Sequence, residues 1–140
     1  MPQRPPEGSV RAVNAATEGK VYPTVQVEVT PERVADFRAV FGQGRGVPPT
    51  FATTVEFMAF AQVAADQELD LDFTRVVHGA QDFTHRRAML EGEVLDATIR
   101  IDSIRVKGTN GFLVVVTDMM DVDGELVCIA TSTMVERALA

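Results

Sequence analysis

Residues 48–69 read PPTFATTVEFMAFAQVAADQEL, and this stretch decides the fold. Its alanines, methionine and phenylalanines favour a helix over a strand, and apolar residues lie nearly all round that helix. The two prolines cannot extend it backwards, so we expect Thr50 or Thr53 to cap its N-terminus. A helix that is apolar on most of its surface is normally buried, and this one is too short to span a bilayer. The rest of the chain must therefore wrap it.

The composition is that of one soluble globular domain. The chain has 140 residues, of which 46% are hydrophobic and 24% charged. Its net charge of −7 argues against nucleic acid and against an anionic membrane surface as partners. The N-terminus has no apolar signal-peptide segment, so we expect a cytoplasmic protein. One cysteine and two histidines argue against a disulfide framework or a metal cluster, and we expect neither a metal nor another cofactor.

Upstream of the central helix we expect a leader, a strand and a first helix. Residues 1–16 are proline-rich, which predicts a flexible leader before a single domain of residues 17–140. Residues 24–29 alternate strictly between valine and polar side chains, as in a half-buried strand. Thr30 then serves as the N-cap of the first helix, which Gly42 ends. The apolar face of this helix consists of Val34, Phe37, Val40 and Phe41.

Four strand-like segments follow the central helix, at residues 75–87, 94–107, 112–120 and 126–135. The second alternates until its apolar phase slips by one residue, which predicts a β-bulge near Ser103. The segment Gly108-Thr109-Asn110-Gly111, which contains the Asn-Gly signal, predicts a hairpin turn, and Asp123-Gly124 predicts the next one. We therefore predict an α+β fold in which an antiparallel sheet wraps around one long central helix. Because residues 112–116 are apolar on both strand faces, we also expect a dimer.

Three motifs, in this order, resemble one family. Residues 47–52 read VPPTFA, and residues 76–83 read VVHGAQDF, which fits the pattern hydrophobic-His-Gly-x-Gln-x-Phe. Residues 86–93 read RRAMLEGE, where Ala88 replaces the proline of the usual Arg-Pro-x-x-x-Gly-Asp turn. The set resembles N-terminal MaoC-like dehydratase domains, in particular the substrate-binding subunit of heterodimeric (3R)-hydroxyacyl-ACP dehydratases. The resemblance covers residues 18–137 and implies the hotdog fold.

The resemblance also implies a function in acyl-thioester (fatty acid) metabolism. Catalytic members carry Asp-x-Asn-Pro-x-His before the central helix, and its histidine and aspartate activate the water of a 2-enoyl thioester hydration. Here that loop, residues 42–49, contains no aspartate, asparagine or histidine. The resemblance therefore implies a non-catalytic subunit that binds acyl-CoA or acyl-ACP. Its partner would be a second copy, in a homodimer, or a catalytic MaoC-like subunit, in a heterodimer.

A self-sufficient homodimeric dehydratase or thioesterase is the alternative. Residues 56–62, EFMAFAQ, resemble the Glu-Ala-Met-Ala-Gln run of the bacterial β-hydroxyacyl-ACP dehydratases, whose helix glutamate works with a partner-subunit histidine. This resemblance would make Glu56 and His78 catalytic. However, the histidine that those enzymes place upstream of the helix is missing here, and a glutamate on an apolar helix can simply mark its solvated edge. A module that binds acyl thioesters without turnover is a third possibility.

The expected substrate-binding residues lie at the start of the central helix and along the His-Gly strand. Strict alternation puts His78 on the strand face opposite Gln81 and His85, unless a bulge at Gly79 brings them together. A structural role for His78, as a hydrogen-bonded core histidine, stays open. Arg86 can meet the phosphates of coenzyme A or of a phosphopantetheine arm. The candidates are Thr50, Phe51, Phe57, His78, Gln81, Phe83, His85 and Arg86.

Overall fold

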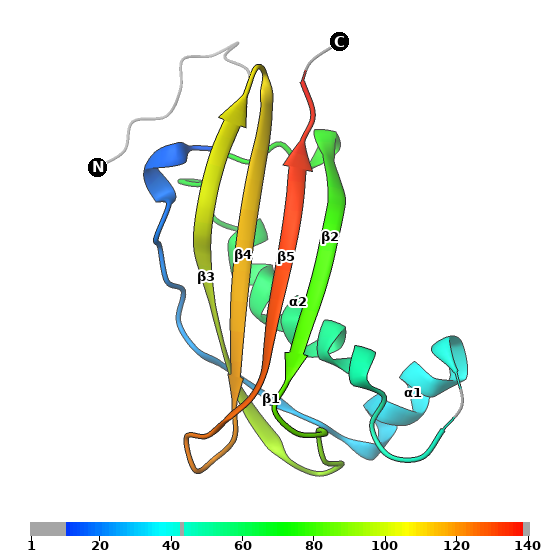
Figure 1. The fold of residues 1–140 in the computed structure, drawn as a ribbon. Coiled ribbons are helices and arrows are strands. Elements are labelled where there is room, and N and C mark those ends of the chain that lie inside the picture. The colour runs from blue at the N-terminus through cyan, green and yellow to red at the C-terminus, as the bar shows by residue number, and fades with distance from the viewer. Residues whose placement is uncertain (1–10, 43, 139–140) are drawn as a thin grey trace.

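The structure is a computed structural model that describes residues 11–42 and 44–138. Five strands form one antiparallel sheet in the order β1-β3-β4-β5-β2 (Figure 1). The elements, in chain order, are η1 (Ala15–Thr17), β1 (Val25–Glu28), α1 (Pro31–Phe41), η2 (Pro49–Phe51), α2 (Ala52–Ala64), η3 (Phe73–Arg75), β2 (Val76–His85), β3 (Val94–Lys107), β4 (Asn110–Met120) and β5 (Leu126–Glu136).

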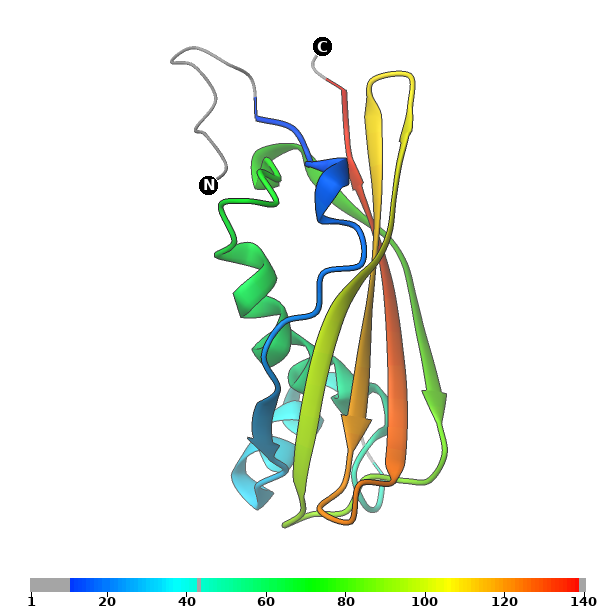
Figure 2. The ribbon, with the colours of Figure 1, turned by 90° about the vertical axis from the view of Figure 1, so that its left-hand side faces the viewer.

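The two α-helices lie on the same side of the sheet, and α2 packs against β1, β3 and β5 (Figure 2). The core forms between α2 and the inward-facing side chains of these strands, since alternate residues of a strand point to one face. Its largest fully buried members include Phe51 at the start of α2 and Leu95, Ile99, Ile101, Leu113 and Met119 on the sheet. The predicted α+β architecture, a sheet around one central helix, is confirmed.

The bounds of α2 differ from the prediction at both ends. The helix continues from the 3-10 turn η2, and Phe51 occupies its N-cap position without a side-chain hydrogen bond, so the predicted threonine caps are wrong. It ends at Ala64 rather than Leu69. Beyond it, the Asp66 carboxylate accepts hydrogen bonds from Lys20 Nζ and Tyr22 Oη, each at 2.7 Å, and these contacts hold the chain in a turn.

Only one side of α2 is buried, which corrects the expectation of a helix wrapped all round. The sheet covers Ala52, Val55, Glu56, Ala59 and Val63, whereas Phe57 on the opposite side is 64% exposed. A single sheet layer covers one stripe of a helix, and the described residues place no second layer over the other. The first helix is also only partly covered, because Val40 and Phe41, which were expected on its apolar face, are exposed.

Several local predictions are confirmed. The Thr30 hydroxyl accepts from the Arg33 amide at 3.1 Å, and the amide of Gly42 bonds to the Arg38 carbonyl, so these residues cap α1. The β3–β4 register shifts between Ile101 and Ser103, where the bulge was expected.

Both hairpin turns form within the predicted segments. The β3–β4 turn consists of Gly108 and Thr109, because Lys107 pairs with Asn110, the first residue of β4. Gly108 supplies the positive φ of 61° that this two-residue turn requires. The turn at residues 123–124 forms as predicted, with the Asp121 carboxylate accepting two backbone amides.

Residues 11–16, expected in a flexible leader, lie against the domain. The Val13 amide donates to Glu136 Oε1 at 3.0 Å, and the Asn14 amide donates to the Leu69 carbonyl at 2.8 Å. Residues 13 and 14 of the predicted leader therefore contact the domain, while residues 1–10 lie outside the described part of the chain. Among the described helices, none has the length and hydrophobicity needed to cross a bilayer.

Candidate functional site

The buried carboxyl group of Glu56 is the centre of the candidate site. Glu56 lies on the sheet-facing side of α2 and is only 6% exposed. Its Oε2 accepts a hydrogen bond from Nε2 of Gln81 on β2, at 3.3 Å. The other amide atom of Gln81, Oε1, is buried and has no partner among the described residues. A buried acidic group with so little hydrogen bonding is unusual in a core that is only structural.

A β-bulge brings His78 onto the strand face of Gln81. The register between β2 and β5 shifts between His78 and Ala80, around Gly79, so the alternation of β2 slips by one residue. This confirms the bulge that would bring His78 and Gln81 together. Phe83 and His85 follow Gln81 at alternate positions of the same strand, and their rings lie 6.2 Å apart. Both histidines of the chain therefore lie on the strand face that meets α2.

Each histidine has a defined hydrogen-bond partner. Nε2 of His78 lies 2.9 Å from the hydroxyl of Ser132 on β5, and Ser132 is 1% exposed. Nε2 of His85 lies 3.0 Å from the Pro49 carbonyl oxygen and 4.0 Å from Cys128 Sγ. Because a carbonyl only accepts, Nε2 of His85 must carry the hydrogen. His85 thus ties the start of the central helix to β2.

Burial dominates the acid–base chemistry of the cluster. Desolvation raises the pKa of the Glu56 carboxyl above its ordinary value, although the Gln81 hydrogen bond and the nearby His78 both oppose the shift. Burial, together with the Glu56 charge, raises the pKa of the Cys128 thiol to about 11, so Cys128 is an unreactive thiol at neutral pH. A carboxyl with a raised pKa beside an imidazole is an arrangement that can transfer protons, and one that can hold a polar ligand group.

Replacing Glu56 with glutamine should test this burial directly. A raised native pKa means that wild-type stability is fully present below the ordinary value of 4.5 and is lost progressively as the pH rises above it. We therefore expect Glu56→Gln to be more stable than wild type at pH 7, by a margin that shrinks toward pH 4.5. Urea denaturation across this range measures the margin. The control is Glu28→Gln, which removes an exposed carboxylate from β1; equal pH dependence in both variants would contradict the prediction.

The remaining candidates are not all part of the cluster. Phe51 is fully buried in the core, and Phe57 lies on the uncovered side of α2. Thr50 is exposed within η2, and Arg86 is exposed just after β2. Nη2 of Arg87 lies 2.7 Å from Glu93 Oε1 and 3.3 Å from Asp121 Oδ2, so this ion-paired arginine connects the turn before β3 to the turn after β4.

Ser132 was missed by the sequence analysis. It pairs with Gln81 in the β2–β5 register and shares the inward face of β5 with Cys128 and Ala130. The available signal was a small polar side chain in the apolar phase of an otherwise alternating strand. That signal is weak, because a hydroxyl gains a role only from the residue that lies opposite it.

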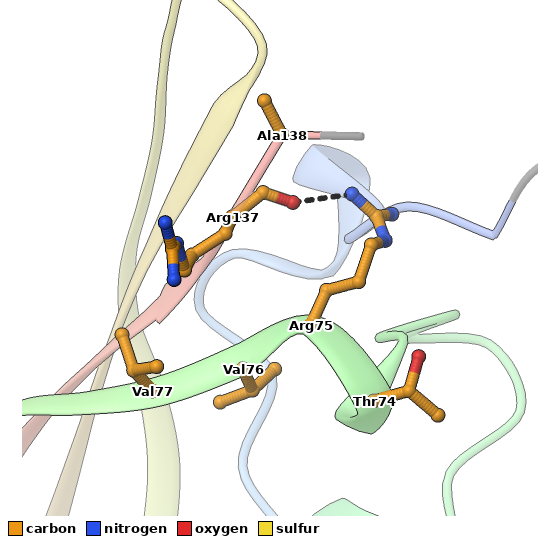
Figure 3. A pocket seen from close by; sticks show the side chains of 6 residues that line it. All are labelled: Thr74, Arg75, Val76, Val77, Arg137 and Ala138. Carbon is orange, nitrogen blue, oxygen red and sulfur yellow. Dashed lines mark hydrogen bonds between the residues drawn. The ribbon is translucent and has the colours of Figure 1, made fainter. Parts of the chain in front are cut away.

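A hollow of about 340 Å³ lies at the start of β2 and is lined by residues that include Arg75 and Arg137 (Figure 3). Two arginines suggest an anion site, but the guanidinium of Arg75 already has partners within the protein. Its guanidinium donates to the Arg137 carbonyl, pairs with Asp72 at 3.1 Å, and lies 3.7 Å from buried Glu136. The hollow is therefore part of a structural clamp. Within residues 11–42 and 44–138, no group of three or more potential metal ligands is present.

Comparison with known proteins places the chain in a family. Residues 41–130 match the family described as "FAS1-like, dehydratase domain region". Over 89% of its length the chain is 36% identical to a UPF0336 protein of Leifsonia xyli, covering 96% of that protein. The chain is a FAS1-like dehydratase-domain protein of the UPF0336 family. A UPF0336 protein of Saccharopolyspora erythraea is 41% identical over 93 residues, which are 66% of this chain and 60% of that relative.

Solved structures similar to this UPF0336 protein confirm the hotdog fold of MaoC-like dehydratases. A chain of the C-terminally truncated HadBC (3R-hydroxyacyl-ACP dehydratase) complex of Mycobacterium tuberculosis matches with a TM-score of 0.71 at 23% identity, covering 85% of this chain and 96% of that one. A MaoC-like dehydratase matches with a TM-score of 0.74 at 18% identity over 88% of this chain and 43% of that one. A hypothetical thioesterase of Streptococcus pneumoniae with coenzyme A matches with a TM-score of 0.56 at 18% identity, covering 82% of this chain and 77% of that one. At sequence identities this low, the likeness to these structures shows the fold alone.

Proposed function

We propose that this UPF0336 protein binds acyl-CoA or acyl-ACP thioesters as the non-catalytic, substrate-binding subunit of a (3R)-hydroxyacyl-thioester dehydratase or enoyl hydratase in the cytoplasm. The observation that carries the proposal is the loop between α1 and α2. Residues 42–49 contain no aspartate, asparagine or histidine, so the catalytic motif of the MaoC-type enzymes is missing at the position where it is expected. The chain therefore keeps the hotdog fold but lacks the catalytic aspartate and histidine, which is the combination expected of a subunit that only binds the substrate.

The Glu56 cluster supports the binding half of the proposal. A thioester carbonyl needs a hydrogen-bond donor, and an acyl chain needs apolar cover. The strand face beside α2 offers both, since the donors of Gln81 and His78 lie on the same face as the ring of Phe83. Arg86, exposed at the end of β2, would meet the phosphates of the carrier arm.

Two exposed features support a protein partner. Strand β2 is the last in the sheet order, so its outer edge has unpaired backbone groups, and its Val77 is 46% exposed. Phe57, on the uncovered side of α2, is 64% exposed. A second hotdog chain that pairs along β2 would protect the edge, and one that reaches over α2 would cover Phe57. Either a second copy or a catalytic MaoC-like subunit fits this description.

Hydration of crotonyl-CoA tests the proposal. We expect no turnover by the purified chain alone, because it lacks the catalytic motif, and turnover after addition of a MaoC-like subunit that carries Asp-x-Asn-Pro-x-His. Sedimentation should show a dimer, or a heterodimer in the mixture, rather than a 15.2 kDa monomer. Appreciable hydration by the isolated chain, abolished by Glu56→Ala, would overturn the subunit role.

The self-sufficient homodimeric enzyme is a second candidate, favoured by one observation. Glu56 is buried with a raised pKa, and His78 is close enough to affect it. Such a pair can serve as general base and acid in a dehydratase, or as base in a thioesterase. In that case Glu56→Gln and His78→Gln would each lower kcat by roughly 10²-fold or more. In a binding subunit the same substitutions would instead weaken thioester binding and leave the partner's chemistry intact.

A further inference from the structure

Ser132 is a buried hydroxyl bonded to an exposed imidazole. Its Oγ lies 2.9 Å from Nε2 of His78, and the residue is 1% exposed on the inward face of β5. Among the described residues this is the one hydrogen-bond partner found for the hydroxyl. The contact crosses from β5 to the bulged end of β2, so it lies where the bulge brings exposed His78 onto the strand face of Gln81.

The direction of this hydrogen bond follows from counting hydrogens. A serine hydroxyl has one hydrogen to donate, and a buried donor without an acceptor is costly. If Nε2 of His78 donated to Oγ, the hydroxyl hydrogen would have no acceptor among the described residues. If Oγ donates to Nε2, the hydroxyl is satisfied and the ring hydrogen of neutral His78 must sit on Nδ1. The bond of one ring nitrogen thus sets which tautomer is present.

We propose that Ser132 is a positioning residue, which holds neutral His78 as the Nδ1–H tautomer so that Nδ1 donates a hydrogen bond to the carbonyl oxygen of a bound acyl thioester. The ligand part of this proposal rests on the proposed function. A fixed neutral donor stabilises a carbonyl oxygen without the ring having to reorient when the ligand binds. The role is the same whether the chain binds the thioester for a partner or transforms it, because both require an anchored carbonyl.

The cluster contains its own internal control. His85 donates from Nε2 to the Pro49 carbonyl, so its hydrogen sits on the opposite ring nitrogen from that of His78. The chain has only these two histidines, and His85→Gln identifies which signals belong to His78. One spectrum therefore compares two neutral imidazoles of opposite tautomer in the same strand.

Long-range ¹H–¹⁵N spectra of labelled protein at about pH 8.5, where an ordinary histidine is neutral, read the tautomers directly. We expect the Nδ1–H pattern for His78 and the Nε2–H pattern for His85 in the wild type. Ser132→Ala should convert His78 toward the Nε2–H form and leave His85 unchanged, and Ser132→Thr should restore the original pattern. Far-UV circular dichroism checks that each variant is folded. A wild-type His78 in the Nε2–H form, or a pattern unchanged in folded Ser132→Ala, would overturn the assignment.

Titration with crotonyl-CoA tests the ligand part. We expect the Nδ1 resonance of His78 to shift on binding, and Ser132→Ala to weaken binding about tenfold through loss of one oriented hydrogen bond. The matched control is Thr131→Ala, which removes a hydroxyl from the neighbouring, outward position and should bind as wild type. Binding without any shift of the His78 signal would overturn the carbonyl contact. Failure of the wild type to bind, with the tautomers as expected, would overturn the proposed function and leave the Ser132–His78 assignment standing.

Discussion

Truncation of Phe51 to alanine is expected to lower the free energy of unfolding by about 3–5 kcal/mol. Phe51 is fully buried where η2 leads into α2, and its ring meets that of Phe37 edge-on at a centroid distance of 5.7 Å. It therefore connects η2, α2 and α1, and its removal would leave a cavity in the core. A loss of this size is a large part of the total stability of a typical domain.

The matched control is Phe57→Ala, six residues along the same segment. Phe57 is 64% exposed in the single chain, so the same truncation should change the free energy of unfolding of the monomer by no more than about 0.5 kcal/mol. The sequence pattern predicted a helix buried on all sides, in which both truncations would be equally severe. Urea denaturation of the two variants distinguishes these cases. A midpoint near that of the wild type for Phe51→Ala, or equal losses in both variants, would contradict the observed packing.

Glu136→Ala is expected to cost about 2–4 kcal/mol. Glu136 is 4% exposed at the end of β5. Its carboxylate accepts the amides of Val13 at 3.0 Å and Asp72 at 2.8 Å, and it lies 3.7 Å from the Arg75 guanidinium. Removing it leaves two backbone donors without their acceptor and takes one of two carboxylates away from the largely buried Arg75 guanidinium, which keeps its pair with Asp72. The N-terminal segment at residues 11–17 should then detach from the domain.

Two variants provide the comparison for Glu136. Glu136→Gln retains one acceptor oxygen and should lose roughly half as much stability, whereas Glu91→Ala, in the exposed turn before β3, should change it by about 0.5 kcal/mol or less. Amide hydrogen exchange at Val13 reports whether the segment has detached. Continued protection of that amide in Glu136→Ala, with an unchanged urea midpoint, would show that the carboxylate does not anchor the segment.

Elements whose determinants lie within a few residues of one another were predictable from the sequence. The capping of α1 requires only Thr30 and the amide three residues on, and the bulge near Ser103 was visible as a slip of the alternating pattern in β3. Both signals are local because helix capping and the two-residue period of a strand depend on backbone geometry rather than on the partner. The order of these elements was enough to predict the antiparallel sheet and its central helix.

The candidate site was only partly predictable. Gln81 and His85 were expected on one face, but β2 shows no slip in its apolar pattern, so the bulge at Gly79 could be inferred only as a condition for His78 to join them. The pairing of β2 with β5 determines that the bulge lies at Gly79. The role of Gly111 was similarly hidden: the sequence suggested a turn, whereas a Cβ there would lie 2.8 Å from Cγ1 of Val13, so a larger residue would require the N-terminal segment to shift.

The sequence was sufficient to determine that α2 exists and that it is the most apolar helix of the chain, but not which side of it meets the sheet. Apolar residues all round a helix contain no information about its rotation, because the hydrophobic effect is non-directional. The packing of the sheet against one side of α2 determines the rotation of the helix, because it buries Glu56 among the core residues and leaves Phe57 exposed. Ser132 acquired its partner in the same way. A carboxyl group becomes a site, and a hydroxyl becomes a positioning group, only through the surfaces that tertiary packing removes from water and the atoms it brings opposite them.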